Sequence, residues 1–450
     1  MSVLALTAAL WFAADPAASR VDVSGGVSVE LRGGRAPVQP SDTTSTWGML
    51  TILTPDVDME VASRRGTLLN FGYTPRVQYR WPNRVGLNRP ILLHQGYATV
   101  QQQLDPRWVL GVNLGGSIGE VDYNSAPAVF GDQTQNPDVN VLQIGAASAG
   151  LDLSGRLTRR HTLGLGADLV YRTPLNVPIV VDETQGEAQV DTVTGGVPEQ
   201  LHVEGTASLD TRISPVDAIE VGLVPGYFDY NRGETQFATI EGIAQWRRQI
   251  RPSLSSGLGA GLFYFAGVGG TASDSNPVQP VATASLTGGL VRKASHNVDA
   301  TLGAGLEPYF NRTQVSLVSR ATTYSTIAIN IPPRWTVRLL LAGLTNATAR
   351  PQALRSNGTP STETLVRLGV PVTYQIDDQQ QFEFGLLMSA RAPHVRSDGF
   401  AFNQGTTWLY VAYRIGVGTA RGGREVGAAS RGAVTRSSRG EAAAASGGRR

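Results

Sequence analysis

The feature that most constrains this chain is an alternation of period two, repeated in long segments from one end to the other. Val21, Val23, Val27 and neighbouring apolar residues alternate with small or polar ones, and the same alternation returns around Leu165 and Gly166. Because successive side chains of a β-strand point to opposite faces, each such segment has one apolar and one polar or small face. The sequence therefore predicts an all-β protein.

The alternating segments cover most of the chain up to Val417. They are residues 21–32, 47–63, 69–80, 108–115, 163–172, 201–213, 219–227, 254–266, 298–306, 335–341, 366–376, 382–392 and 409–417. Many run to roughly 11 residues or more, whereas strands of soluble sheets average about five or six. Strands of this length cross a bilayer when they are tilted, so we expect a transmembrane β-barrel rather than a soluble sandwich.

Composition agrees with a barrel. Apolar residues make up 41% of the sequence, charged residues only 16%, and there are 52 glycines, a mixture too apolar for a disordered chain and too rich in glycine for a helical one. No segment offers about 18 uninterrupted apolar residues, which excludes a helical membrane protein. Cysteine is absent, so disulfides and thiolate metal sites are excluded.

The connections alternate in length, as they do in outer-membrane barrels with short periplasmic turns and longer extracellular loops. Short turns are expected at 65–66, 105–106, 155–160, 214–216, 251–252, 295–296, 332–333 and 378–380. Long loops are expected at 34–45, 81–90, 123–140, 174–199, 269–280, 346–363 and 393–405, while the outer connections at 231–232 and 311–313 are short. This order predicts an antiparallel up-and-down barrel in the outer membrane of a Gram-negative cell.

About 18 strands are expected, because 47–53 and 57–63 keep the same parity across Thr54-Pro55 and are interpreted as one strand with a proline irregularity. Residues 1–18 are predicted to be a signal peptide, with an apolar run at 3–14. Residues 19–417 form the expected barrel. Residues 418–450 are rich in Arg, Gly, Ala and Ser and are expected to be a disordered periplasmic tail.

The charged residues on the polar faces are the candidate channel-lining groups, and they mix both signs. They are Asp168, Arg172, Glu204, Asp210, Arg212, Asp299, Glu307, Arg338, Arg367, Glu383 and Arg391. Such a mixture suits a wet lumen without a single strong field. Ion pairs that brace the wall explain the same residues equally well, so the sequence leaves both roles open.

No catalytic, metal or cofactor site is expected. Residues 115–119 satisfy G-x-S-x-G, but they end an alternating strand with no helix after it, unlike the nucleophile turn of a hydrolase. The five histidines are scattered without metal-ligand spacing. An enzyme site assembled from distant residues of a barrel stays open as an alternative.

The segment TPDVDMEVASRRGTLLNFGYTPRVQYR, residues 54–80, resembles outer-membrane porin-like barrels of myxobacteria and relatives, some of which accompany polysaccharide export. Arg64, Arg65, Tyr73, Pro75 and Arg76 carry the likeness. The resemblance implies an outer-membrane pore for a polymer delivered by a periplasmic polysaccharide export protein. The remainder of the chain shares only the general architecture.

The function predicted from the sequence is an aqueous channel of the outer membrane, with exopolysaccharide export as its specific form. The alternatives are a structural or adhesive barrel and, less favoured, an outer-membrane enzyme. Expected partners are outer-membrane lipid, lipopolysaccharide and the barrel assembly machinery, besides the export protein. No nucleic-acid partner is expected.

Overall fold

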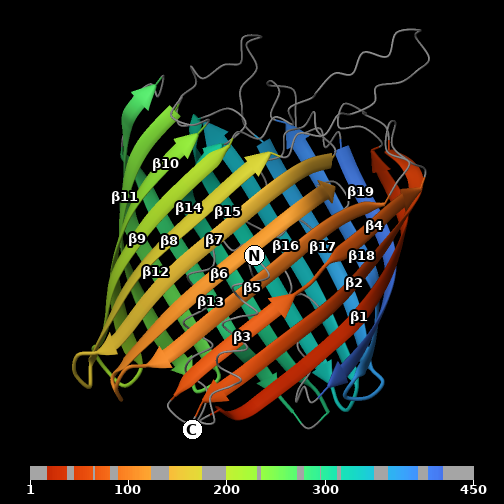
Figure 1. Ribbon diagram of the computed structural model, residues 1–450, viewed down its shortest axis with the longest axis horizontal. Coiled ribbons are helices and arrows are strands. Elements are labelled where there is room, and N and C mark those ends of the chain that lie inside the picture. The colour runs from red at the N-terminus through yellow and green to blue at the C-terminus, as the bar shows by residue number, and fades with distance from the viewer. Residues whose placement is uncertain are drawn as a thin grey trace.

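The computed structural model shows one closed antiparallel sheet, and its strands tilt around a wide barrel (Figure 1). The structure describes residues 18–37, 45–63, 66–81, 90–122, 141–174, 199–230, 235–270, 278–293, 295–311, 316–348, 363–393 and 404–418. No helix occurs within these ranges. The predicted signal peptide, apart from Ala18, and the predicted tail, apart from Gly418, lie outside the described residues, so both stay predictions.

Nineteen strand segments follow one another along the chain, most of them longer than the alternation alone predicts. They are β1 (Ala18–Pro37), β2 (Ser45–Ser63), β3 (Thr67–Tyr73), β4 (Arg76–Trp81), β5 (Ile91–Gln103), β6 (Trp108–Asp122), β7 (Val141–Arg156), β8 (His161–Pro174), β9 (Gln200–Arg212), β10 (Asp217–Tyr230), β11 (Thr235–Arg251), β12 (Leu254–Gly270), β13 (Val278–Arg292), β14 (Asn297–Asn311), β15 (Ser316–Ile331), β16 (Trp335–Thr348), β17 (Glu363–Gln375), β18 (Gln380–Pro393) and β19 (Gln404–Gly418).

Each strand pairs with its neighbours in sequence, and β1 closes the barrel against β19. The closing pairs run without a shift from Ser24 with Gly418 to Arg35 with Thr407. Segments β3 and β4 both pair with β2 and with β5, so together they occupy one strand position. The barrel therefore has 18 strands, as predicted.

The predicted irregularity exists, but it falls one strand later than expected. Strand β2 runs unbroken through Pro55, which confirms that 47–63 is a single strand. The break comes at Thr74-Pro75, between β3 and β4. Because Leu53 pairs with Val77 and Val57 with Tyr73, the two prolines come opposite each other, and neither has an N–H to donate. β2 continues because β1 still pairs with it there.

The predicted short turns all join strands at one end of the barrel, at the bottom of Figure 1. Tight backbone hydrogen bonds close several of them, such as Leu157 N to His161 O at 3.0 Å and Ile376 N to Gln380 O at 2.9 Å. The start of β1 and the end of β19 lie at the same end. Short turns face the periplasm in bacterial barrels. The predicted long loops fall largely outside the described residues.

Most strands carry exposed aliphatic side chains on one face, which is the outer surface of the barrel. On β19, for example, Leu409 is 64% and Val411 45% exposed, whereas Trp408 and Tyr410, which alternate with them, are buried. Exposed aromatic residues lie near both rims, Trp47 and Trp81 at the long-loop end, Trp335 at the turn end. An apolar band between two aromatic girdles is the surface of a transmembrane barrel.

Glycines on the inner face make room for aromatic rings of the neighbouring strand. Gly72 lies under the Tyr97 ring and Gly303 under the Tyr324 ring, so that a Cβ added at either glycine would come within 2.2 Å of ring carbon. Both pairs are direct cross-strand partners. The glycines of the inner face are therefore partly packing sites.

No described helix is long and apolar enough to cross a membrane.

The face assignment for Leu165 and Gly166 is confirmed, but Gly166 is not an open position. Leu165 is 42% exposed on the outer face, while a Cβ on inward Gly166 would come within 2.4 Å of Thr206 Oγ1. Neighbouring Leu223 and Gly222 on β10 offer a cleaner pair. Leu223 is 46% exposed, and a Cβ at Gly222 meets its nearest atom at an ordinary 3.6 Å.

We predict that Leu223→Arg lowers the free energy of unfolding by about 2–4 kcal/mol, because it puts a cation in the hydrocarbon. Gly222→Arg places the same side chain in the lumen beside Glu220 and is expected to change stability by less than about 1 kcal/mol. Reversible urea unfolding in lipid vesicles measures both. Equal losses for the two variants contradict the face assignment.

Candidate functional site

The inner wall of the barrel holds the candidate site, because the charged residues singled out in the sequence gather there. Register and exposure place ten of them on the face opposite the exposed aliphatic residues. These are Asp168, Arg172, Glu204, Asp210, Arg212, Asp299, Glu307, Arg338, Arg367 and Glu383. Arg391 belongs to β18, but its side chain lies outside the described part.

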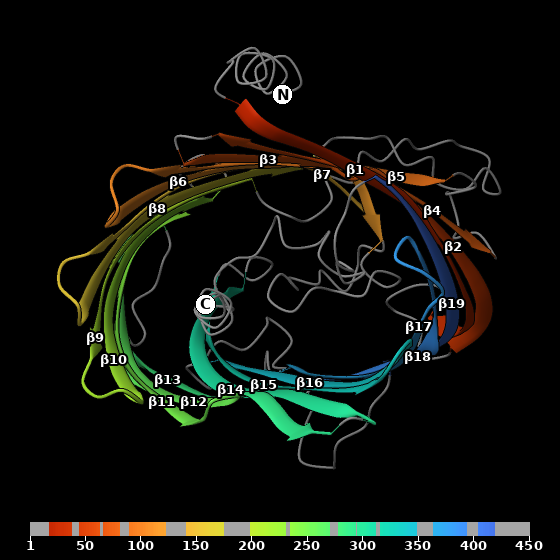
Figure 2. The ribbon, with the colours of Figure 1, turned by 90° about the horizontal axis from the view of Figure 1, so that it is seen from below.

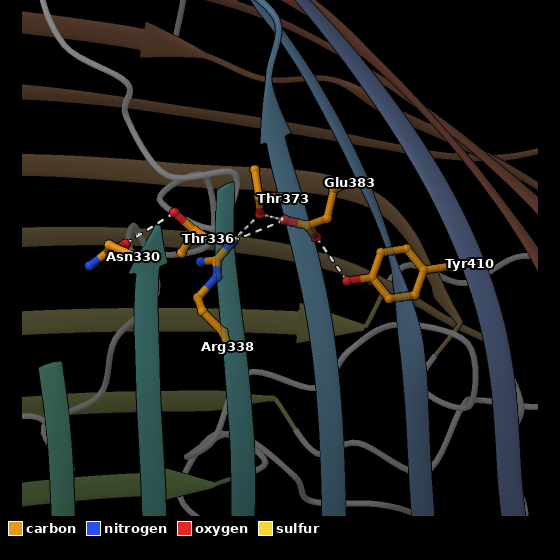
Figure 3. A network of polar contacts seen from close by, with 6 residues as sticks. All are labelled: Asn330, Thr336, Arg338, Thr373, Glu383 and Tyr410. Carbon is orange, nitrogen blue, oxygen red and sulfur yellow. Dashed lines mark hydrogen bonds and ion pairs between the residues drawn. The ribbon is translucent and has the colours of Figure 1, made fainter. Parts of the chain in front are cut away.

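Glu383 is the centre of the best-connected group, which crosses four adjacent strands (Figure 3). Its Oε2 accepts hydrogen bonds from Arg338 Nη2 and from Thr373 Oγ1, both at 2.9 Å. Its Oε1 accepts one from the Tyr410 hydroxyl at 2.8 Å. Arg338 Nη2 also lies 3.3 Å from Thr373 Oγ1. The carboxylate therefore has a cation and two hydroxyl donors on its two oxygens.

The polar contacts continue from this group toward the turn end. Thr336 donates to Asn330 Oδ1 at 3.0 Å, and Asn330 Nδ2 donates to Asp299 Oδ2 at 3.2 Å. Asp299 also pairs with Arg292. Strands β13 to β19 thus carry polar groups linked from strand to strand along the inner wall.

The opposite wall has its own ion pairs. Arg247 on β11 contacts both Asp210 on β9 and Glu220 on β10, the latter at 3.5 Å. Glu204 lies 3.3 Å from His202 Nε2. A further pair bridges the closing seam, where Arg414 on β19 reaches Asp56 on β2 at 3.0 Å. These inward charges largely satisfy one another, which supports the bracing role that the sequence left open.

On β12 to β14 the inner wall is built largely from small residues. On β12, β13 and β14 the inward positions are mostly glycine, serine and threonine, including Gly259, Thr283, Ser285, Thr301 and Gly305. Hydroxyls and bare backbone make much of this wall polar without charge, apart from Arg292 on β13 and Asp299 and Glu307 on β14. Side chains of this size do not reach far from the wall.

Two apolar patches on the inner face were missed by the sequence analysis. Leu50, Ile52 and Trp408 are at most 3% exposed and pack with Leu387, although all four point inward by register. Residues 49–53 are apolar on both faces except for Thr51, so the sequence shows no alternation there. Without alternation, nothing in the local pattern indicated that the inward side chains are buried.

The second patch is a run of stacked rings on β9 to β12. His202 stacks on Phe228 with centroids 3.9 Å apart, and Phe228 on Phe237 at 4.8 Å. Phe265 lies against Phe237 at 5.4 Å. These rings come from four strands, so only the barrel register brings them together. No spacing within the sequence could have predicted the stack.

The structure places the G-x-S-x-G motif, residues 115–119, inside β6, with no sharp turn into a helix. Of the described histidines, His94 contacts Tyr73 on the outer face and His161 contacts Thr211. Among the described residues, no group of three or more His, Asp and Glu could hold a metal ion. His394 lies outside the described part.

No protein-family model and no curated protein matches the sequence. Solved barrels are similar in outline only. The outer-membrane protein OpdK of Pseudomonas aeruginosa is 8% identical, with 88% of this chain and 99% of that chain covered and a TM-score of 0.44. OccK9 (OpdG) of the same species is 12% identical, with 89% and 100% covered and a TM-score of 0.44. The ferric-catecholate import receptor Fiu of E. coli is 9% identical, with 89% and 82% covered and a TM-score of 0.43.

These likenesses are too distant to assign the chain to any one of those groups. The barrel itself is more informative. A closed antiparallel barrel of 18 strands with an apolar outer band is the architecture of bacterial outer-membrane proteins. The protein is an outer-membrane β-barrel.

The Glu383 group predicts an energetic coupling that a double-mutant cycle measures. The double variant Arg338→Met/Glu383→Gln should lower the free energy of unfolding by about 1–3 kcal/mol less than the sum of the two single losses. Each single change leaves the remaining charge in the wall without its partner, whereas the double change removes both charges. Tyr410→Phe should cost only about 1 kcal/mol. Additive losses for Arg338 and Glu383 in urea unfolding contradict the contact.

Proposed function

We propose that the barrel forms an aqueous channel across the outer membrane. The observation that carries the proposal is a wall of 18 strands whose inner face is largely glycine, serine, threonine and mutually paired charges. A circumference of 16 to 18 strands is wider than such small side chains can fill. Water occupies the remainder.

The pairing of inward charges supports weak ionic selectivity. Pairs such as Arg338 with Glu383 and Arg247 with Asp210 and Glu220 keep the net charge of the lumen small. Small cations and anions then face similar electrostatic barriers, and salt screens the remaining differences. The eleven charged residues predicted from the sequence act in this proposal as wall braces that a passing solute also meets.

The two signs are nevertheless distributed unevenly around the lumen. Among described inward side chains, β15 to β19 carry four arginines and one carboxylate, and β7 to β10 carry five carboxylates and three arginines. The first set is Arg320, Arg338, Arg367, Arg414 and Glu383, and the second is Asp152, Asp168, Glu204, Asp210, Glu220, Arg156, Arg172 and Arg212. Figure 2 shows these strands across the lumen from each other. Such a field orients a dipolar solute without selecting its net charge.

The finer proposal is passage of an exopolysaccharide, supported by the resemblance of residues 54–80 and by the hydroxyl-rich wall of β12 to β14. In this proposal a periplasmic polysaccharide export protein delivers the polymer, and the barrel assembly machinery inserts the barrel among outer-membrane lipid and lipopolysaccharide. Neutral wall hydroxyls exchange hydrogen bonds with sugar hydroxyls without holding a charged ligand.

A structural barrel is the second candidate, and one observation favours it. Leu50, Ile52 and Trp408 are almost fully buried although they face the lumen, as expected where a barrel interior is filled. A lumen filled throughout would not conduct.

We predict that the purified full-length protein conducts ions in planar bilayers, with cation-to-anion permeability within about threefold of unity and closer to unity at high salt. Arg338→Gln should shift the permeability toward cations, because it removes one inward positive charge beside Glu383. Reversal potentials across a salt gradient give the ratio.

Absence of conductance in correctly folded protein would overturn the channel and place the structural barrel first.

The same bilayers test the finer proposal, since neutral oligosaccharides should interrupt the current as they enter. Uninterrupted current at millimolar oligosaccharide excludes the polymer pore while leaving the channel intact.

A further inference from the structure

The tight turns repeat one arrangement that barrel closure does not require. The residue that enters the turn is an exposed aliphatic side chain in most of them, and it continues the outward parity of its strand. These residues are Leu104, Leu157, Ile213, Ile250, Ile331 and Ile376, all between 36% and 56% exposed. The apolar band of the barrel therefore extends into the turns.

Exposed cations lie in or beside four of the tight turns along one arc of the rim. They are Arg107, Arg159, Arg160, Arg248, Arg251 and Lys293. Arg248 lies 3.9 Å from Asp217, and the other five have no ion pair with any described carboxylate. Asp105, the acid nearest Arg107, instead accepts backbone N–H bonds from Arg107 and Trp108 at 2.6 and 2.9 Å.

The arc spans consecutive hairpins, from β5–β6 to β13–β14, that pair side by side in the barrel (Figure 2). The β9–β10 turn has no exposed cation of its own, but Arg248 on β11 pairs with Asp217 beside it. The turn between β17 and β18 differs, since it exposes Asp377 and Asp378. The β15–β16 turn carries one exposed cation, Arg334, so among the described residues the positive charge of this rim is concentrated on the hairpins from β5–β6 to β13–β14. A uniform solubility requirement does not explain this difference.

We propose that this basic arc binds the phosphate groups of anionic phospholipids in the periplasmic leaflet of the outer membrane. The aliphatic residues at the turn entrances lie at the depth where acyl chains meet headgroups, and the adjacent arginines extend to the headgroup phosphates. Cations beside a membrane surface attract anionic lipid. The arc would hold a belt of lipid on this side of the barrel.

Side-chain direction favours lipid over an acidic periplasmic protein. Leu157, Ile213 and Ile250 share the outward parity of the lipid-facing Leu153, Leu209 and Trp246 on their own strands. A protein docked below the rim would meet the turns from the periplasm and would leave these outward side chains uncovered. The inference does not depend on whether the barrel conducts.

Native mass spectrometry of the full-length protein tests the proposal, with lipid retention measured after addition of phosphatidylglycerol or of phosphatidylcholine with the same acyl chains. The test variant is Arg159→Gln/Arg160→Gln/Arg251→Gln. Its matched control, Arg159→Lys/Arg160→Lys/Arg251→Lys, keeps the charge. Arg107→Gln/Lys293→Gln probes the same arc on two other turns, should the first variant fold poorly. Heat-dependent gel migration reports folding of each protein.

The native protein should retain phosphatidylglycerol at least fivefold better than phosphatidylcholine, since one cation at a membrane surface gives roughly that factor. The Gln triple should fall to within about twofold of no preference, while the Lys triple keeps the preference. Equal retention of both lipids by the native protein, or an undiminished preference in the folded Gln variants, overturns the proposal. Binding of a polyglutamate peptide without lipid preference, lost in the Gln triple, would overturn it in favour of an acidic protein partner.

Discussion

The structure depends on closing the backbone hydrogen-bond ladder. Hydrocarbon offers no partner for a free N–H or C=O, so a sheet can enter a membrane only when it has no edge. Here β1 and β19 join through twelve consecutive residue pairs, which makes the ladder continuous around the barrel. Where Pro55 and Pro75 face each other, the ladder lacks donors rather than leaving them unsatisfied. The wall thus tolerates two prolines at one place because proline has no donor to lose.

Closure also determines what each side of the wall can be. With a wall one strand thick, every second side chain faces lipid and the remainder face the lumen. The lipid side is aliphatic with aromatic girdles, and the lumen side carries cross-strand polar groups such as those around Glu383. Because the partners of Glu383 come from three other strands, this group braces the strands against one another. Any solute that passes meets side chains that already have partners.

The sequence predicted the architecture well because its signal is local. Alternation within each segment identified the strands and their faces, and the alternation of short and long connections gave the antiparallel order. The proline irregularity was placed at Pro55 instead of Pro75, because the sequence does not show that β1 supports β2 on its far side. The buried inward cluster of Leu50 and Trp408 and the stack on Phe237 were missed for a related reason. Their members are far apart in the chain and meet only through register.

Cysteine accessibility tests the central claim of a one-strand wall around a wet lumen most directly, and the absence of native cysteine makes single substitutions clean reporters. On β15, Thr326 faces inward and Ile327 outward, and on β14 Thr301 faces inward and Leu302 outward. In protein reconstituted into vesicles, Thr301→Cys and Thr326→Cys should react with a charged, membrane-impermeant maleimide. Leu302→Cys and Ile327→Cys should stay unlabelled. Labelling that fails to alternate, or that favours the outward positions, would contradict the account.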